Sequence, residues 1–195
     1  MTTAPRKRSS TVALAILGAA AFALAGCREE QVDAQAFPDL QSCKEAANRG
    51  GMFPSSDCDT AFAAAQTLHV ESAPRYDSLE VCEAQHGEGA CGDEAAVQSG
   101  GSGSIFMPLM MGYLMGSMLG GQRGVAAAQP MYKTADGKFT NASGTSTYSS
   151  NTGGGKMAAS QFTRPPTTFD KPPMTKTSVQ SRGGFGASGT TSQGG

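Results

Sequence analysis

Four cysteines within one acidic part of the chain constrain its fold more than any other feature. They are Cys43, Cys58, Cys82 and Cys91. Hydrophobic residues make up only 38% of the chain, there is no tryptophan, and 26 of the 195 residues are glycine. Such a chain buries too little apolar surface to offset the entropy of ordering all of it. We therefore expect one small folded head, stapled by disulfides, and much disorder.

The head, residues 37–94, is expected to contain three short helices and a turn at "HGEGAC". Two helices would begin after the capping residues Asp39 and Ser78, each followed by a Leu-x-x-Cys spacing. A third would begin near Asp57, with apolar residues on one face, namely Ala61, Phe62, Ala65 and Leu68. A head of about 55 residues is small enough to need covalent staples.

Four cysteines permit three disulfide pairings. We favour the pairs Cys43–Cys58 and Cys82–Cys91, because both close short loops between consecutive elements. The crossed pairings stay open at this point.

The N-terminus, residues 1–26, has the pattern of a secretory signal peptide. Basic residues at 6–8 precede an apolar run from Val12 to Leu24, which is too short for a transmembrane span of about 20 residues. The sequence "LAGC" that follows, ending at Cys27, looks like a bacterial lipobox. It implies cleavage before Cys27 and a diacylglycerol thioether on its sulfur, which would attach the protein to a membrane. The alternative is ordinary cleavage after Ala25, which would release a soluble protein.

The number of cysteines favours the lipid anchor. Five cysteines leave one thiol over in an oxidising compartment, whereas lipid on Cys27 lets the other four pair completely. Arg28 follows the anchor, and the absence of aspartate there favours the outer membrane, facing the periplasm. A linker, residues 27–36, would join the anchor to the head.

The segment 95–124 is rich in glycine and methionine and carries no charge between residues 99 and 121. Four glycines recur every fourth residue and would form one stripe on a helix: Gly112, Gly116, Gly120 and Gly124. Glycine costs about 1 kcal/mol in a helix relative to alanine, so the stripe suggests close helix packing and self-association. A helix lying on the membrane surface and a flexible linker are the alternatives. A helix from Ile105 to Gly121 would be about 25 Å long, which is short for a membrane span.

Charge divides the rest of the chain. Residues 28–98 carry 4 basic and 14 acidic residues, whereas residues 122–195 carry 8 basic and 2 acidic ones. The basic tail, residues 125–195, can attract the acidic head or seek an anionic partner. Its Gly, Ser, Thr and Pro content, with Pro-Pro pairs after Arg164 and Lys171, predicts a disordered and partly polyproline II arm. Asp136-Gly137 predicts a hairpin over residues 131–148 that is marginal without a partner surface.

The sequence contains no familiar catalytic or metal-binding pattern. His69 and His86 match no common zinc spacing with the cysteines, and surface positions are the better account of both. A solvated acidic face explains the carboxylates, and neither an EF-hand loop nor a G-x-S-x-G elbow is present. We therefore expect no enzyme, no cofactor and no metal site. Secretion argues against nucleic acid as a partner.

The order of these motifs resembles the DUF1190 family of bacterial proteins, also called UPF0441. The resemblance rests on the lipobox and on "HGEGAC", "SGSIFMPLMMGYLMG", "GKFTNASG" and "SRGGFG", and it covers nearly the whole mature chain. The family is uncharacterised, so the resemblance implies no catalytic residue. Its members are often encoded beside a glutathionylspermidine-synthase-like protein, which implies a role in the envelope.

The predicted fold is a mostly disordered chain with a small all-α disulfide-stapled head, one Gly/Met-rich apolar helix and a short β-hairpin. We expect a non-enzymatic outer-membrane lipoprotein that acts as an envelope interaction or scaffold module. Its partner would be an envelope protein or an anionic envelope polymer. Two alternatives stay open, namely an accessory subunit of a glutathionylspermidine-synthase-like ligase, and a thiol–disulfide redox protein that uses Cys82 and Cys91.

Overall fold

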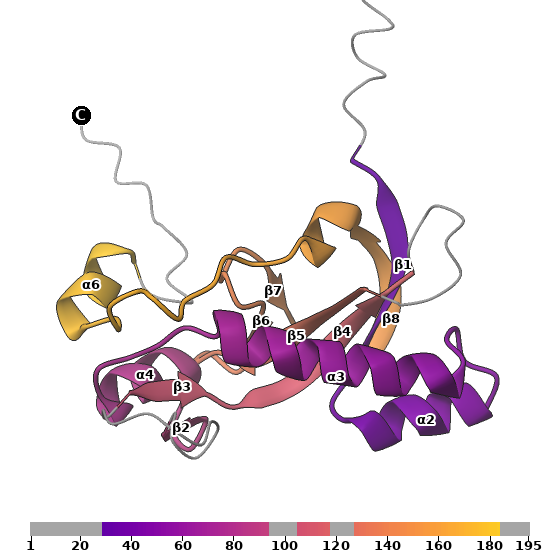
Figure 1. Ribbon diagram of the computed structural model, residues 1–195, viewed down its shortest axis with the longest axis horizontal. Helices are drawn as coiled ribbons and strands as arrows, with labels where there is room; N and C mark the ends of the chain where they lie inside the picture. The colour runs from indigo at the N-terminus through magenta and orange to yellow at the C-terminus, as the bar shows by residue number, and fades with distance from the viewer. Residues whose placement is uncertain (1–28, 94–104, 118–126, 184–195) are drawn as a thin grey trace, which may run out of the picture. The chain divides into compact units, whose positions relative to one another are not determined.

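A computed structural model describes residues 29–93, 105–117 and 127–183. The chain divides into two units between Glu30 and Gln31, and every element below belongs to the second unit. Its centre is a six-stranded antiparallel sheet in the order β7-β6-β5-β4-β1-β8, which curls into a half-barrel (Figure 1). These strands are β1 (Gln31–Phe37), β4 (Met110–Gly116), β5 (Ala127–Lys133), β6 (Phe139–Thr140), β7 (Thr147–Tyr148) and β8 (Gly153–Ala158). A separate pair consists of β2 (Cys91–Asp93) and β3 (Phe106–Pro108).

Alternating side chains of the central strands contribute to two cores on opposite faces of the sheet. In β4, Tyr113 and Met115 join one core, whereas Leu114 joins the other. The first core is covered by α3 (Ser55–Ser72), which packs on β4 and β5, with α2 (Leu40–Asn48) beside it (Figure 1). The second core contains Ala34, Ala36, Leu114 and Met131, against which Phe139, Tyr148, Met157 and Phe162 pack.

The three helices expected in the head are confirmed as α2, α3 and α4 (Leu79–His86). The Asp39 carboxylate accepts a hydrogen bond from the Ser42 N–H at 2.7 Å and so caps α2. The Ser78 hydroxyl caps α4 in the same way. Helix α3 begins at Ser55, slightly before the expected start. Local capping chemistry therefore predicts these helices well.

The expected fold class, a mostly disordered chain with an all-α head, is wrong. The sheet is the framework of the molecule, and the helices share a core with it: Phe37 of β1 and Tyr113 of β4 pack among side chains of α2 and α3. Strand β1 lies where a linker was expected, and it pairs with β4 on one side and with β8 on the other. The physical reason is long-range pairing, which brings strands from distant parts of the sequence into one sheet.

The predicted Gly/Met-rich helix is also wrong, because its described residues form β3 and β4. Strand β4 lies between β1 and β5 and is packed on both faces, so its apolar run lacks the alternation of a half-exposed strand. Gly112, at φ +146°, lies in a β-bulge where a Cβ would approach the Phe37 carbonyl oxygen to 2.8 Å. Gly120 and Gly124 lie outside the described residues. Within the described ranges, no helix has the length and apolarity needed to cross a membrane.

Gly116 makes room for an aromatic ring and not for a second helix. The 3-10 turn η1 (Ala159–Phe162) follows β8, and its Phe162 ring lies over Gly116. A Cβ at Gly116 would lie only 2.5 Å from Phe162 Cζ. The missing side chain therefore lets the ring cover the sheet face opposite α3.

The described part of the basic tail is folded, contrary to the expectation of a disordered arm. It contains β5 to β8, η1 and α6 (Lys176–Ser181). The hairpin predicted at Asp136-Gly137 is confirmed, because β5 and β6 pair on either side of this turn. The Thr134 N–H donates to the Lys138 carbonyl at 2.9 Å within it. Strand β4 pairs with β5 and provides the partner surface that the hairpin needs.

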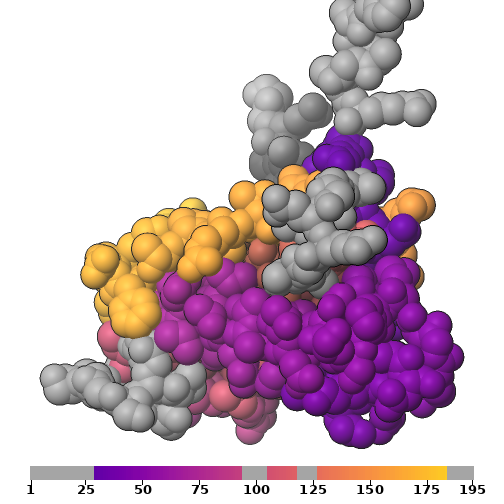
Figure 2. Space-filling model, turned by 45° about the vertical axis from the view of Figure 1, so that its right-hand side comes forward, coloured from indigo at the N-terminus to yellow at the C-terminus, as the bar shows by residue number. Residues whose placement is uncertain are grey.

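The basic tail packs against the acidic N-terminal part, which is one of the two outcomes that the charge pattern allows. Figure 2 shows the C-terminal segments (orange to yellow) directly against the helical ones (purple). Among the described residues, ion pairs join the two parts at three places: Lys156 with Asp33 at 2.9 Å, Lys176 with Glu80 at 3.6 Å, and Arg164 with Glu71. Such exposed pairs contribute little to stability individually, but they engage three of the tail's cations.

Candidate functional site

Arg75 is a buried cation beside the end of α3, and the candidate site is built around it. The residue is 4% exposed. Its guanidinium donates from Nη2 to the Val70 carbonyl at 2.9 Å and from Nη1 to the Thr168 hydroxyl. It also lies 4.5 Å from the centre of the Phe169 ring. These contacts hold a permanent positive charge in a fixed orientation.

The tail segment 163–175 lies across the end of α3 and carries the Pro-Pro pairs. The Thr168 N–H donates to the Glu71 carbonyl at 2.9 Å, and the Thr168 hydroxyl donates to the Ala73 carbonyl at 2.7 Å. Further along, the Met174 N–H donates to the Arg75 carbonyl at 2.7 Å. Between these contacts the chain turns, with the Lys171 N–H donating to the Thr168 carbonyl at 3.2 Å, and two prolines at 172–173 then restrict the backbone before Met174. The segment is therefore fixed beside Arg75 by hydrogen bonds to backbone carbonyls.

A cavity of about 350 Å³ lies beside this segment, and we call it the cationic cavity. Arg75, Lys171 and Arg182 line it, and no acidic side chain of the described residues does. Its remaining lining consists of proline, serine, threonine, alanine and methionine side chains. Within the part of the chain that the structure describes, neither Lys171 nor Arg182 makes an ion pair.

The cationic cavity is suited to a carboxylate or a phosphate. Guanidinium groups bind such anions through paired N–H donors, and an ammonium group adds a point charge. No acidic side chain of the described residues lines the cavity, so no lining carboxylate among them competes with a ligand for Lys171 or Arg182. Arg75 is already held in place, which reduces the entropy lost on binding.

Comparison with known proteins assigns the chain to a family. The family model described as a protein of unknown function (DUF1190) matches residues 31–194. The chain belongs to this family. A UPF0441 protein of Klebsiella pneumoniae is 36% identical over 192 residues, which cover 91% of this chain and 79% of the relative. The UPF0441 protein of Erwinia tasmaniensis is 38% identical with the same coverage of both chains. The UPF0441 protein of Serratia proteamaculans is 36% identical over 194 residues, which cover 93% of this chain and 82% of the relative. No solved structure matches the chain.

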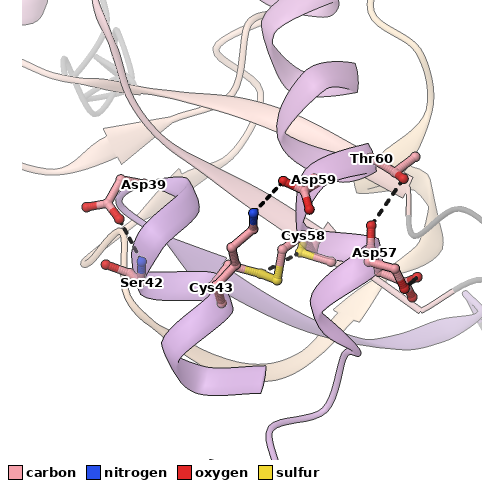
Figure 3. The surroundings of a disulfide bond; sticks show 10 residues. Asp39, Ser42, Cys43, Asp57, Cys58, Asp59 and Thr60 are labelled. Atoms are coloured by element: carbon pink, nitrogen blue, oxygen red, sulfur yellow. Dashed lines mark hydrogen bonds and ion pairs between the residues drawn. A yellow bond between two sulfur atoms is a disulfide. The ribbon is translucent and has the colours of Figure 1, made fainter. Parts of the chain in front are cut away.

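In this DUF1190 protein, both disulfides have the pairing favoured from the sequence. Cys43–Cys58 joins α2 to α3 across a Cα–Cα distance of 5.8 Å (Figure 3). The residues that follow these cysteines, Lys44 and Asp59, form an ion pair at 2.7 Å. Cys82–Cys91 joins α4 to β2 across 6.2 Å. Both therefore tie neighbouring elements together. Cys27, the predicted site of lipidation, lies outside the described residues.

The two histidines are buried, so the expectation of surface positions is wrong. His86 Nδ1 donates to the Lys133 carbonyl at 2.7 Å, which leaves Nε2 to accept from the Tyr76 hydroxyl at 2.8 Å. His69 Nδ1 lies 3.1 Å from the Tyr132 hydroxyl. Burial lowers the pKa of each histidine to about 4, so both are neutral at neutral pH. Among the described residues, no group of three His, Cys, Asp or Glu side chains is placed to bind a metal.

Sequence reasoning about this DUF1190 chain missed the cationic cavity. In the sequence, Lys171 stands out only as the residue before a Pro-Pro pair, and no pattern indicates a binding role for Arg75 or Arg182. One signal was available, because Arg75 is the single basic residue between Arg49 and Arg123. A lone cation in an acidic stretch does not reveal which distant segment packs beside it, so its role emerges only from the fold.

Proposed function

We propose that this protein is a non-enzymatic lipoprotein of the bacterial envelope that acts as an interaction module and binds an anionic polymer in the cationic cavity. The signal-peptide pattern and the lipobox support attachment through lipid on Cys27. Arg28 directly after this residue supports the outer membrane, facing the periplasm. In that compartment the peptidoglycan, whose peptides carry free carboxylates, is an anionic polymer within reach.

The composition of the cationic cavity is the observation that carries this proposal. Three cations line one cavity, and no acidic side chain of the described residues lines it. Other tail cations, such as Lys156 and Lys176, already pair with carboxylates. An anionic ligand would therefore be attracted here.

The alternatives have weaker support. The role of ligase subunit rests on the gene neighbourhood of family members alone. A redox role would require an accessible, reactive disulfide, whereas Cys82 is fully buried and its bond to Cys91 ties α4 to β2. We therefore assign this disulfide a structural role.

Co-sedimentation with purified peptidoglycan sacculi tests the proposal. The protein would lack its first 27 residues and keep the whole second unit. We expect the wild type to sediment with sacculi, and the Lys171→Ala/Arg182→Ala variant to bind at least about tenfold more weakly, because hydrogen bonds to charged groups contribute about 1.5–3 kcal/mol each. The control, Lys138→Ala/Lys156→Ala, removes the same charge outside the cavity and should bind like the wild type.

Two outcomes would overturn the proposal. If the wild type stays in the supernatant while the sacculi sediment, peptidoglycan is not a ligand of this protein. If both double variants lose binding equally, overall charge and not the cationic cavity drives the attraction.

A further inference from the structure

A second cavity of about 380 Å³ adjoins the cationic cavity and shares Ser143, Pro165 and Pro166 with it as lining. Among the described residues that line it, Arg164 is the one charged side chain, and it pairs with Glu71. The rest of its lining carries mostly hydroxyl and amide groups, including those of Gln129, Asn141, Ser146, Gln161 and Thr163. We name it the polar cavity. A ligand that leaves the cationic cavity on this side therefore meets neutral hydrogen-bonding groups.

Two glutamine side chains in the lining of the polar cavity provide one hydrogen-bond acceptor and one donor for a ligand. Gln129 is 4% exposed, and its Nε2 donates to the Thr163 carbonyl at 3.1 Å. Its Oε1 accepts a hydrogen bond from no described residue. This oxygen is not one of the solvent-inaccessible side-chain atoms that lack a partner, so a ligand can donate a hydrogen bond to it. Gln161 Oε1 accepts from the Tyr148 hydroxyl at 2.7 Å, which leaves its Nε2 as a donor. A hydroxyl group both donates and accepts, so this pair of atoms suits hydroxyl-bearing ligands.

We propose that the ligand is an acidic glycan strand, with a carboxylate in the cationic cavity and the hydroxyls of the neighbouring sugar in the polar cavity. The inference rests on the proposed function and specifies its ligand. Pro165 and Pro166 belong to both linings and offer an apolar surface on which a sugar ring can pack. A phospholipid would need an apolar lining for its acyl chains, and the polar cavity presents amides and hydroxyls in that place.

Isothermal titration calorimetry with defined oligosaccharides tests the inference. The probes are tetragalacturonate, its fully methyl-esterified neutral form, and inorganic pyrophosphate as an anion without a sugar. Gln161→Met keeps the length of the side chain and removes both its donors and the acceptor of the Tyr148 hydroxyl. Gln180→Met, at an exposed position of α6, is the matched control. Thr163→Phe fills the polar cavity from an exposed position and serves as a second variant should Gln161→Met unfold.

We expect tetragalacturonate to bind the wild type at least about tenfold more tightly than the methyl ester does, because the ester lacks the charge-assisted contacts. Gln161→Met and Thr163→Phe should weaken the binding of tetragalacturonate by about tenfold and leave the affinity for pyrophosphate unchanged. Gln180→Met should change the affinity for neither probe.

The possible failures are distinguishable. If the polar-cavity variants bind tetragalacturonate like the wild type while Lys171→Ala/Arg182→Ala does not, the glycan inference fails and the proposed function stands. If Lys171→Ala/Arg182→Ala also binds like the wild type, both fail. If phosphatidylglycerol vesicles bind the wild type and tetragalacturonate does not, the ligand is a lipid phosphate and the inference is wrong.

Discussion

Replacing Gly116 with alanine tests how the Gly/Met-rich segment is packed. The added Cβ would lie 2.5 Å from Phe162 Cζ, and normal carbon contacts are about 3.5–4.0 Å, so the ring must move by about 1 Å. Overpacking of this kind costs about 1–3 kcal/mol, and the lower entropy of the unfolded chain returns about 0.4–1 kcal/mol. The centres of these two ranges leave a net loss of about 1 kcal/mol, which corresponds to a decrease in Tm of about 2–4 °C for a domain of this size, measured by circular dichroism.

Gly155→Ala is the matched control for this experiment. Gly155 lies in β8, and a Cβ there would meet no atom within 4 Å. Its replacement should leave Tm unchanged or raise it slightly. If Gly116→Ala is as stable as Gly155→Ala, the Phe162 ring does not occupy this space and the packing argument is refuted.

Three further predictions concern the disulfide, the buried histidines and the anchor. Replacing Cys43 and Cys58 together with alanine should lower the free energy of unfolding by about 3 kcal/mol; an unchanged urea midpoint would contradict a stabilising role. Stability should fall as pH decreases from 6.5 towards 4, because His69 and His86 take up protons in the unfolded state before the folded state, each with a folded pKa of about 4. The loss reaches about 3 kcal/mol for each histidine, and equal Tm values in calorimetry at pH 7 and pH 4.5 would refute it. Cys27→Ser should leave the precursor unprocessed and release the protein from membranes, and unchanged fractionation would exclude the lipid anchor.

Local chemistry allowed part of this fold to be predicted from the sequence. The capping side chains of Asp39 and Ser78, the Asp136-Gly137 turn and the short-loop disulfides each depend on residues close together in the chain. The sheet depends on distant ones, since Ala34 of β1 faces Gly116 of β4. Strands β6 and β7 have two residues each and show no periodicity of their own. They are ordered because the sheet beside them offers unpaired backbone groups.

The candidate site was harder to predict for the same reason. The charge pattern indicated that the tail could attract the head, and the ion pair between Arg164 and Glu71 agrees with this. It did not indicate that Arg75, Lys171 and Arg182 would line one cavity, because the contact between α3 and the tail segment depends on hydrogen bonds to backbone carbonyls. Backbone groups are common to all residues and therefore leave no signature in the sequence.

An NMR titration of the isotopically labelled protein, lacking its first 27 residues, tests binding in the cationic cavity most directly. The titrant would be the soluble fragments that lysozyme releases from peptidoglycan sacculi. The account predicts that the largest amide shift changes cluster at the lining residues Ser143, Thr168, Lys171 and Arg182, and that Lys171→Ala/Arg182→Ala abolishes them. Shift changes centred elsewhere on the described residues, or no changes at millimolar fragment concentrations, would contradict it.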